Sequence, residues 1–258
     1  MLKEGQFSQA NLAFEWIVFQ SEDPEEIRAA RLGRARSLKK MGEYERASSV
    51  LSSINLLSAS RELRPVLVYE DMLLRYLISD FQGSVSKGLF AKTLFQEGEY
   101  LQPYRLLMSI SHYQIQNFEQ GELYGKQYLN SLDSTHTTDL LIRFDSLTNL
   151  PLPILKNPKK ASNLSTFLPG LGQVYAGSTG EGMLSFGLHT ISLGGAVLAA
   201  FGGYYISAWL GAAIIIQRLH AGGRSRSSAL AEKNNRLEIN QYSQPIIQFL
   251  LIADSSTL

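Results

Sequence analysis

The feature that most constrains this chain is a long uncharged run in its second half. From Ala161 to Gln217, 57 residues include one charged side chain, Glu181, and the 36 residues from Gly182 to Gln217 include none. A helix that crosses a membrane needs about 20 apolar residues, each adding about 1.5 Å. The run is too long for one such helix and nearly long enough for two.

Gly202 and Gly203 divide this run into arms of 20 residues (182–201) and 14 residues (204–217). We therefore predict a helical hairpin that spans a membrane. The second arm is short, so it must recruit the next two residues, 218–219, or enter the membrane only in part. A hairpin buried inside a soluble domain is the alternative interpretation.

Glycine is concentrated in the same region, where 13 of the chain's 21 glycines lie between residues 170 and 223. Glycine weakens helices in water but is common where membrane helices pack closely. Gly195, Ala199 and Gly203 recur every four residues along the first arm. They predict a helix-packing face and allow a homo-oligomer to form through the hairpin.

A glycine-rich motif, FLPGLGQVYAG over residues 167–177, precedes the run. Its proline ends the preceding element and its glycines permit positive φ, while Gln173 and Tyr175 can form hydrogen bonds at the polar interface, with the tyrosine ring among lipid headgroups. The glycine spacing differs from that of both nucleotide-binding loops, which excludes a phosphate-binding loop. We predict a turn through which the chain enters the membrane, formed by Pro169, Gly170, Gly172, Gln173, Tyr175, Gly177 and Gly182.

The first half of the chain, residues 1–131, repeats a short turn in which a small or polar residue precedes an aromatic residue and a helical pattern follows. The first turn begins at Gly5, and the aromatic residues are Phe7, Tyr44, Phe81, Tyr100 and Phe118. The first two are 37 residues apart, and the last three are spaced by 19 and 18 residues, about half that period. This rhythm predicts an array of helix-turn-helix repeats.

The second repeat is the best formed. Asp23, Pro24 and Glu26 predict a capping box at the start of a helix that continues to Met41 and is ended by Gly42. The apolar face of a second helix is then formed by Tyr44, Ala47, Leu51 and Ile54.

This segment resembles a tetratricopeptide repeat in its turn and in its small and large packing positions, which are Ala35, Leu38, Ala47, Leu51 and Ile54. The resemblance covers residues 1–131 and implies a concave surface that binds a peptide or protein partner. The match begins at the turn before a second helix. We therefore expect that the natural chain, or its ancestor, extends upstream, which leaves open that a signal peptide was lost with that part.

The motif at residues 167–177, with Glu181 and Gly182 after it, resembles the opening segment of the TM2 domain, a small two-helix membrane domain. It is also similar to a segment of bacterial proteins that couple tetratricopeptide-like repeats to a glycine-rich membrane hairpin. The two resemblances together imply a bacterial membrane or cell-envelope protein.

Three prolines at positions 151, 153 and 158 follow a last helix over residues 140–147 and mark a linker. We expect an all-α chain with a helical repeat domain over residues 1–131, a last helix and linker over 132–162, a membrane hairpin over 163–223 and a polar tail over 224–258. The tail contains an apolar patch, 246–252, which we interpret as a strand or an interfacial segment because it is too short to span as a helix.

Two groups of side chains in the first half have structural interpretations. Large aromatic residues at helical spacing are expected in the core: Phe14, Trp16, Phe19, Tyr69 and Phe90. Six basic residues between positions 28 and 40 scatter around one helix instead of forming a stripe. We expect a solvated helix there and no nucleic-acid partner.

Charge is distributed unevenly along the chain. Residues 1–150 carry 16 basic and 19 acidic side chains, whereas residues 151–258 carry 8 and 4. The cations of the second half flank the uncharged run on both sides, so the positive-inside rule places both flanks and the repeat domain in the cytoplasm, at the inner membrane. A lost signal peptide would instead place the repeats in the periplasm.

No residue pattern indicates catalysis, a metal or a cofactor. The chain has no cysteine, its four histidines show no i, i+4 ligand spacing, and no serine lies in a G-x-S-x-G turn. His189 lies inside the first arm, where we expect a hydrogen bond to a neighbouring helix in preference to proton transfer.

We therefore expect a non-catalytic, membrane-tethered protein that mediates protein interaction or assembly. Its partners would be membrane lipid and a protein or peptide bound on the repeat surface. The alternatives are an oligomeric transport or channel component and a soluble helical protein with a buried apolar hairpin.

Overall fold

The computed structural model describes residues 6–132 and 136–253, and every regular element in these residues is a helix. The expected all-α class is therefore confirmed for the described residues. The chain forms two compact units: unit 1 is Met1–Asn149 with Pro245–Leu258, and unit 2 is Leu150–Gln244. Gly5, where the first predicted turn begins, lies outside the described residues.

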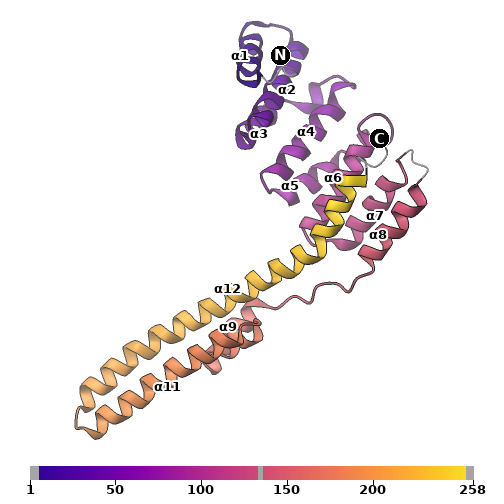
Figure 1. The fold of residues 1–258 in the computed structure, drawn as a ribbon. Coiled ribbons are helices and arrows are strands. Elements are labelled where there is room, and N and C mark those ends of the chain that lie inside the picture. Colours follow the sequence, from indigo (N-terminus) through magenta and orange to yellow (C-terminus); the bar gives the residue numbers. More distant parts are fainter. Residues whose placement is uncertain (1–5, 133–135, 254–258) are drawn as a thin grey trace. The chain divides into compact units, whose positions relative to one another are not determined.

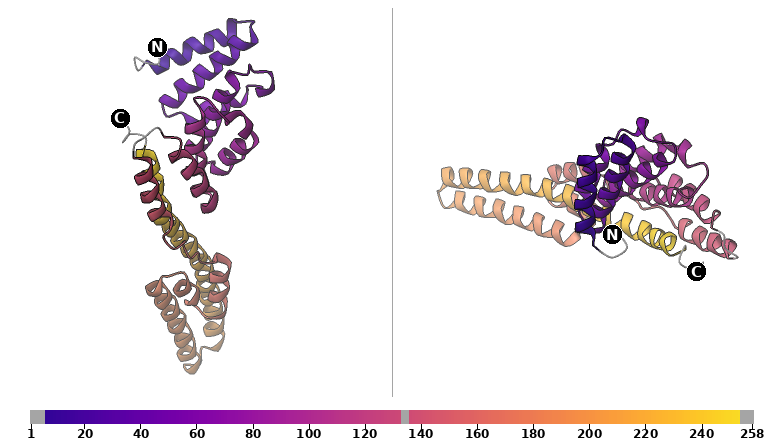
Figure 2. Two further views of the ribbon diagram at one scale, coloured as in Figure 1. Left: turned by 90° about the vertical axis from the view of Figure 1, so that its right-hand side faces the viewer. Right: turned by 90° about the horizontal axis from the view of Figure 1, so that it is seen from above.

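Most of unit 1 is a succession of helices in which each packs against the next in the chain (Figures 1 and 2). The α-helices are α1 Phe7–Gln20, α2 Pro24–Lys40, α3 Tyr44–Ser52, α4 Leu63–Leu77, α5 Phe81–Phe90, α6 Leu101–Gln114, α7 Phe118–Leu129 and α8 Thr137–Thr148. Two short 3-10 helices lie between them, η2 Leu56–Ser58 and η3 Lys92–Phe95.

Every second helix of unit 1 begins at a constant interval. The starts of α1, α3, α5 and α7, each 37 residues after the one before, are Phe7, Tyr44, Phe81 and Phe118. The fourth residue of each helix is small and buried: Ala10, Ala47, Ser84 and Gly121. Small side chains let the preceding helix approach, and a Cβ at Gly121 would lie 2.9 Å from the Tyr113 ring of α6. The interval noted for the first pair of turns therefore holds for all four helices.

The start of α2 follows the predicted cap in part. Pro24 is the first helical residue, and the Asp23 carboxylate accepts a hydrogen bond from the Glu25 amide at 2.9 Å. The predicted reciprocal bond is wrong, because Glu26 Oε2 instead accepts from Ser21 Oγ at 2.6 Å.

The turn between α2 and α3 has the predicted residues in the predicted places. Gly42 has a left-handed φ of +79°, which ends α2, and Tyr44 is the first residue of α3. Ala47 and Leu51 are buried in the same core cluster as Leu38 of α2. The two helices therefore pack through the apolar face that the sequence indicates.

Four of the six basic residues of α2 bind acidic groups of unit 1. Arg36 Nε donates to Glu70 Oε1 of α4 at 2.7 Å, and Lys39 Nζ donates to the other oxygen of the same carboxylate. Glu70 is 5% exposed, and a buried carboxylate needs such partners. Two further arginines of α2 pair with glutamates of α1 and α2. The expected solvated helix is thus corrected, because these cations form ion pairs within the unit.

The aromatic side chains expected in the core divide between core and surface. Their assignment to the core is wrong for three residues that are at least 61% exposed, Trp16, Phe19 and Phe90. Phe14 and Tyr69 are half-buried. The Phe14 ring packs so closely on Gly33 of α2 that an added Cβ would meet it at 2.5 Å. Trp16 and Phe19 lie away from this contact, on a part of α1 that no described residue covers.

The apolar patch at residues 246–252 completes the core of unit 1. It is helical and forms the last turns of α12, Tyr205–Ala253, so its interpretation as a strand or interfacial segment is wrong. Ile246 and Leu250 are fully buried, and the Phe249 ring stacks on Phe144 of α8 with centroids 6.2 Å apart. The patch is helical because its buried side chains recur every three to four residues, on one face.

Unit 2 begins with irregular residues 151–157 and continues with helices. These are α9 Pro158–Phe167, α10 Leu171–Tyr175, α11 Thr179–Phe201 and residues 205–244 of α12. α11 and this part of α12 run side by side in opposite directions (Figures 1 and 2). α12 continues past Gln217 and past the two residues that the second arm was expected to recruit, because residues 218–244 contain no proline.

His112 of α6 gives unit 1 a dependence on pH. It is 3% exposed, its ring stacks on Tyr124 with centroids 5.6 Å apart, and neither ring nitrogen has a hydrogen-bond partner among the described residues. Burial lowers the pKa of His112 below its ordinary value of 6.5. The unfolded chain then binds a proton that the folded chain does not, so stability falls as the pH drops below that value toward the folded pKa.

We predict that His112→Phe, which keeps a flat ring against Tyr124, removes this part of the pH dependence. In urea unfolding of the full chain in detergent, wild type should lose up to about 1.4 kcal/mol per pH unit more than the variant as the pH falls below about 6.5. His136→Phe, at a side chain that is 74% exposed, is the matched control for exchanging an imidazole for a phenyl ring. Equal slopes for wild type and His112→Phe would show that this imidazole is not linked to folding.

Candidate functional site

The glycine-rich motif connects α9 to α11 through the short helix α10. α9 begins at Pro158 with Asn157 as its cap, since Asn157 Oδ1 accepts from the Lys160 amide at 3.0 Å. Pro169 lacks a backbone donor, and α9 ends two residues before it. Gly170, with φ +92°, then turns the chain into α10.

Two close backbone contacts in this motif require glycine. A Cβ at Gly170 would lie 2.1 Å from the carbonyl oxygen of Gly182 in α11, and a Cβ at Gly172 would lie 2.0 Å from that of Ala161 in α9. Gly177 has φ +93° and leads the chain into α11. These glycines build a tight turn in which three helices meet.

Gln173 lies inside this turn and is 2% exposed. Its Oε1 accepts from Ser165 Oγ at 3.0 Å, and Ser165 Oγ accepts from the Gly172 amide at 3.2 Å. Its Nε2 donates to the carbonyl of Gly223 in α12 at 3.4 Å. The role expected for Gln173 at the polar interface is therefore corrected: this buried amide links α9, α10 and α12.

Tyr175 is also held within unit 2. Its hydroxyl accepts from the Asn157 amide at 3.1 Å, and the Nζ atoms of Lys156 and Lys160 lie 5.5 and 5.3 Å from its ring centroid. The ring packs against a small buried cluster contributed by α9 and α12. The ring is half-buried, and its expected place among lipid headgroups stays a prediction.

Two asparagines of α12, which no sequence motif singles out, complete the site. Asn235 Oδ1 accepts from the Lys156 amide, and Asn235 Nδ2 donates to the Lys156 carbonyl, both at 2.7 Å. The neighbouring Asn234 donates to the carbonyl of Ala176. The one signal in the sequence is the presence of two adjacent asparagines in a helix. Asparagine is a poor helix former, and its side-chain amide can pair with the N–H and C=O groups of a backbone.

An ion pair fixes the register of α11 against α12. Arg226 donates Nε and Nη2 to the two carboxylate oxygens of Glu181, each at 2.7 Å. Further along, the rings of His189 and His220 lie 6.3 Å apart. His189 is 5% exposed, and its Nδ1 donates to the Ser185 carbonyl of its own helix at 2.8 Å. The expected bond to a neighbouring helix is not formed within the described residues, where Nε2 has no partner.

Beyond the ion pair, α11 is largely apolar, and most of its large side chains are exposed. Among the described residues it is the one helix long and apolar enough to cross a membrane, and 6% of its most apolar 18-residue window is buried. An added Cβ at Gly195 or Gly203 would meet nothing within 4 Å, and Gly203 lies past the end of the helix. These glycines do not pack α11 against α12. A helix-packing role for Gly195, Ala199 and Gly203 therefore stays a prediction, for contacts between two copies of the chain.

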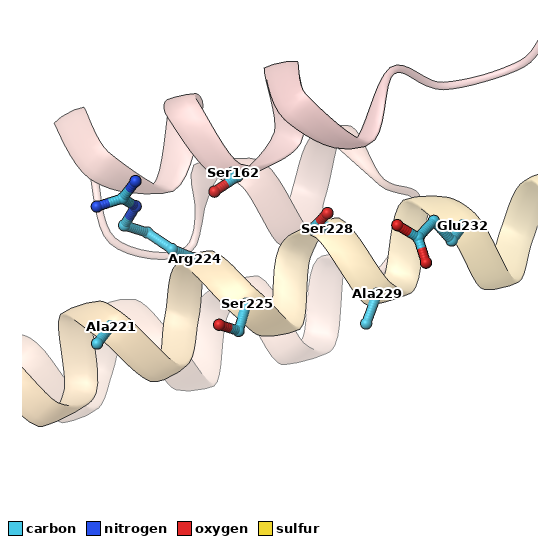
Figure 3. A pocket seen from close by; sticks show the side chains of 7 residues that line it. All are labelled: Ser162, Ala221, Arg224, Ser225, Ser228, Ala229 and Glu232. Atoms are coloured by element: carbon cyan, nitrogen blue, oxygen red, sulfur yellow. The ribbon is translucent and has the colours of Figure 1, made fainter.

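A shallow polar groove of about 570 Å³ lies between α9 and α12 (Figure 3). Its lining residues are Ser162, Ala221, Arg224, Ser225, Ser228, Ala229 and Glu232. Arg224 and Glu232 stand at opposite ends of the groove, with the hydroxyls of Ser162 and Ser228 between them (Figure 3). The sequence indicates no role for these residues beyond the charge that flanks the uncharged run.

No group of three or more His, Cys, Asp or Glu side chains in the described part of the chain could hold a metal ion. Comparisons with protein-family models, curated proteins and solved structures find no match for this chain. The resemblances to tetratricopeptide repeats and to the TM2 domain therefore stay predictions.

We predict that Gly172→Ala destabilises unit 2 by about 1–3 kcal/mol, because its Cβ would collide with the backbone of Ala161. Gly180→Ala is the matched control, since a Cβ there meets nothing within 4 Å and alanine is the better helix former by about 0.5–1 kcal/mol. Thermal unfolding of the full chain in detergent should show a lower Tm for the first variant and an equal or higher Tm for the second. Equal Tm values for Gly172→Ala and wild type would contradict the close contact.

Proposed function

We propose that this chain is a membrane-anchored helical protein without catalytic activity, and that unit 1 binds a protein or peptide partner. The uncovered surface of α11 carries the proposal. Its 23 residues extend about 34 Å at 1.5 Å per residue, against a hydrocarbon thickness of about 30 Å. Apolar surface of this extent is costly in water and marks a contact with lipid or protein.

The first part of α12 extends the proposed anchor into a hairpin. Residues 205–217 are uncharged, and most of their large apolar side chains are exposed. Tyr204, Tyr205 and Trp209 lie at or near the turn, 69–72% exposed. Aromatic side chains with a polar tip favour the boundary between hydrocarbon and water, so this end of the hairpin suits the far interface.

The opposite end of the hairpin suits the near interface. The Glu181–Arg226 ion pair and the hydrogen-bonded motif lie there, and Arg218 can extend its long side chain toward the same surface. Unit 2 carries eight basic and three acidic side chains, all outside residues 182–217. This positive charge favours contact with phospholipid phosphates.

Unit 1 offers an apolar face for a partner. Leu12, Trp16 and Phe19 of α1 are 61%, 61% and 83% exposed and follow the i, i+4, i+7 spacing of one helix face. The 37-residue interval of α1, α3, α5 and α7 supports the repeat interpretation, and repeat arrays present such faces to peptides and helices.

The anchor is tested by placing charge on the apolar surface of α11. Ile191 and Leu198 are both 73% exposed, so Ile191→Arg with Leu198→Arg leaves the packing of the chain intact. An arginine at the centre of a spanning helix costs about 3 kcal/mol. We predict that wild type stays with carbonate-washed membranes and that the double variant is largely released.

Leu237→Arg is the control for this experiment, because Leu237 is 49% exposed in the polar part of α12. It should remain with the membrane as wild type does. Release of wild type by carbonate, or retention of the double variant, would rule out α11 as the anchor.

The partner surface is tested by Trp16→Ala with Phe19→Ala. Both side chains are exposed, so the variant should keep the helical content and Tm of wild type while losing at least tenfold in recovery of the protein that co-purifies with wild type from membrane extracts. Leu123→Ala, 46% exposed on α7, is the control and should recover the partner in full. Unchanged recovery by the double variant would exclude this face of α1.

A further inference from the structure

The groove between α9 and α12 is separate from the hydrogen-bonded motif and has its own arrangement of charge. Arg224 supplies a guanidinium at one end, Glu232 a carboxylate at the other, and three serines lie along the lining (Figure 3). Arg226, two residues from Arg224, is by contrast bound to Glu181 by two hydrogen bonds. The polar groups of the groove are thus arranged around an open space.

The spacing of the two charges selects a ligand that carries both signs. Arg224 and Glu232 are eight residues apart on one helix, about 12 Å along its axis, so they do not neutralise each other by direct contact. Neither forms an ion pair with another described residue. A simple anion would satisfy Arg224 and leave the carboxylate at the other end without a partner. A ligand with an anionic and a cationic group a few ångströms apart satisfies both.

The register of the hairpin sets the depth of this groove. If the Glu181–Arg226 pair marks the edge of the hydrocarbon, Arg224 lies about 3 Å to its apolar side and Glu232 about 9 Å to its polar side. The polar layer of each leaflet is about 5–8 Å thick. The groove therefore spans the depth at which phospholipid headgroups lie, and the guanidinium is the deeper of its two charges.

We propose that this groove binds the headgroup of a phospholipid of the phosphatidylethanolamine class, an inference that rests on the membrane anchor proposed above. Arg224 donates two N–H bonds to the phosphate oxygens, and the hydroxyls of Ser162 and Ser228 donate to the same oxygens. Glu232 accepts N–H bonds from the ammonium. In such a lipid the phosphate lies nearer the acyl chains and the ammonium nearer water, the same order as Arg224 and Glu232.

The same chemistry discriminates among headgroups. A trimethylated ammonium has no N–H to donate to Glu232, and a glycerol headgroup has no positive charge to offer it. Phosphatidylcholine and phosphatidylglycerol therefore lose the outer contact while keeping the phosphate contact to Arg224. Selectivity comes from Glu232, and affinity for phosphate comes from Arg224.

The test uses the full chain in detergent micelles, where binding does not require insertion into a bilayer. Phosphatidylethanolamine with a fluorescent acyl chain is titrated with protein, and fluorescence anisotropy reports binding. Unlabelled phosphatidylethanolamine should compete at least tenfold better than phosphatidylcholine or phosphatidylglycerol. Competition by inorganic phosphate or soluble phosphoethanolamine equal to that of the lipid would overturn the proposal, because the site would then take a free anion or a free headgroup.

Two variants separate the roles of the charges. Arg224→Gln should weaken the binding of every phospholipid at least tenfold. Glu232→Gln should weaken phosphatidylethanolamine at least tenfold and leave phosphatidylglycerol unchanged or tighter. Arg236→Gln, at an exposed arginine outside the groove, is the control and should bind as wild type does. Equal losses for both lipids in Glu232→Gln, or no loss in Arg224→Gln, would overturn the assignment.

A third variant guards against loss of folding. Ser228→Leu fills the groove between the two charges from a helical, half-buried position and should give the same loss of binding with unchanged helical content. Vesicle flotation of wild type separates the two proposals. Flotation without headgroup preference in micelles overturns the headgroup site and leaves the anchor standing, whereas selective binding in micelles without flotation overturns the anchor and leaves the headgroup site standing.

Discussion

Unit 2 depends on the close approach of three helices at two glycines. Because neither Gly170 nor Gly172 carries a Cβ, the backbone of α10 can lie directly against Gly182 of α11 and Ala161 of α9. This approach buries Gln173, whose amide then reaches α12. The direction in which α11 leaves the motif follows from these contacts, and so does the pairing of Glu181 with Arg226. A single methyl group at either glycine would displace the whole arrangement.

The surroundings of α11 change along its length. At its start α11 is bound by a hydrogen-bonded motif and an ion pair, and a few residues later its side chains face open space. The polar contacts are directional and fix the register, whereas the apolar surface specifies only that something apolar must cover it. The groove with Arg224 and Glu232 lies where the polar contacts end and the apolar surface begins. An amphipathic ligand could contact both there.

Local features of the sequence predicted local features of the fold well. Turns at Phe7, Tyr44, Phe81 and Phe118 mark helix starts. Their signals act within a few residues: Gly42 is left-handed before Tyr44, and Asp80 and Asn117 cap the helices that begin at Phe81 and Phe118. Exposure of Trp16 and Phe19 could not be predicted in this way, since it depends on which helices cover α1. The uncharged run ends at Gln217, yet α12 continues through this change from apolar to polar residues.

In the candidate site, too, the local features could be predicted from the sequence and the distant contacts could not. The glycines of the motif were predicted from the sequence, because a positive φ and a close backbone contact both favour a residue without a Cβ, which the sequence shows directly. The partners of Gln173 and Lys156 were not, because Gly223 and Asn235 lie far along the chain in a polar helix. Gln173 was expected at a polar interface, whereas its amide forms hydrogen bonds inside the unit.

The contact between Lys156 and Asn235 has a consequence for the order in which unit 2 can be completed. The two residues are 79 positions apart, and Gln173 and Gly223 are 50 apart, so both bonds wait for α12 to be synthesised. α11 lies between the partners of both bonds in the chain, so it leaves the ribosome before Gly223 and Asn235. Until Gly223 and Asn235 have been made, the apolar surface of α11 exists without the polar contacts that later hold the unit together. Another apolar surface must therefore cover α11 before the fold around it is finished.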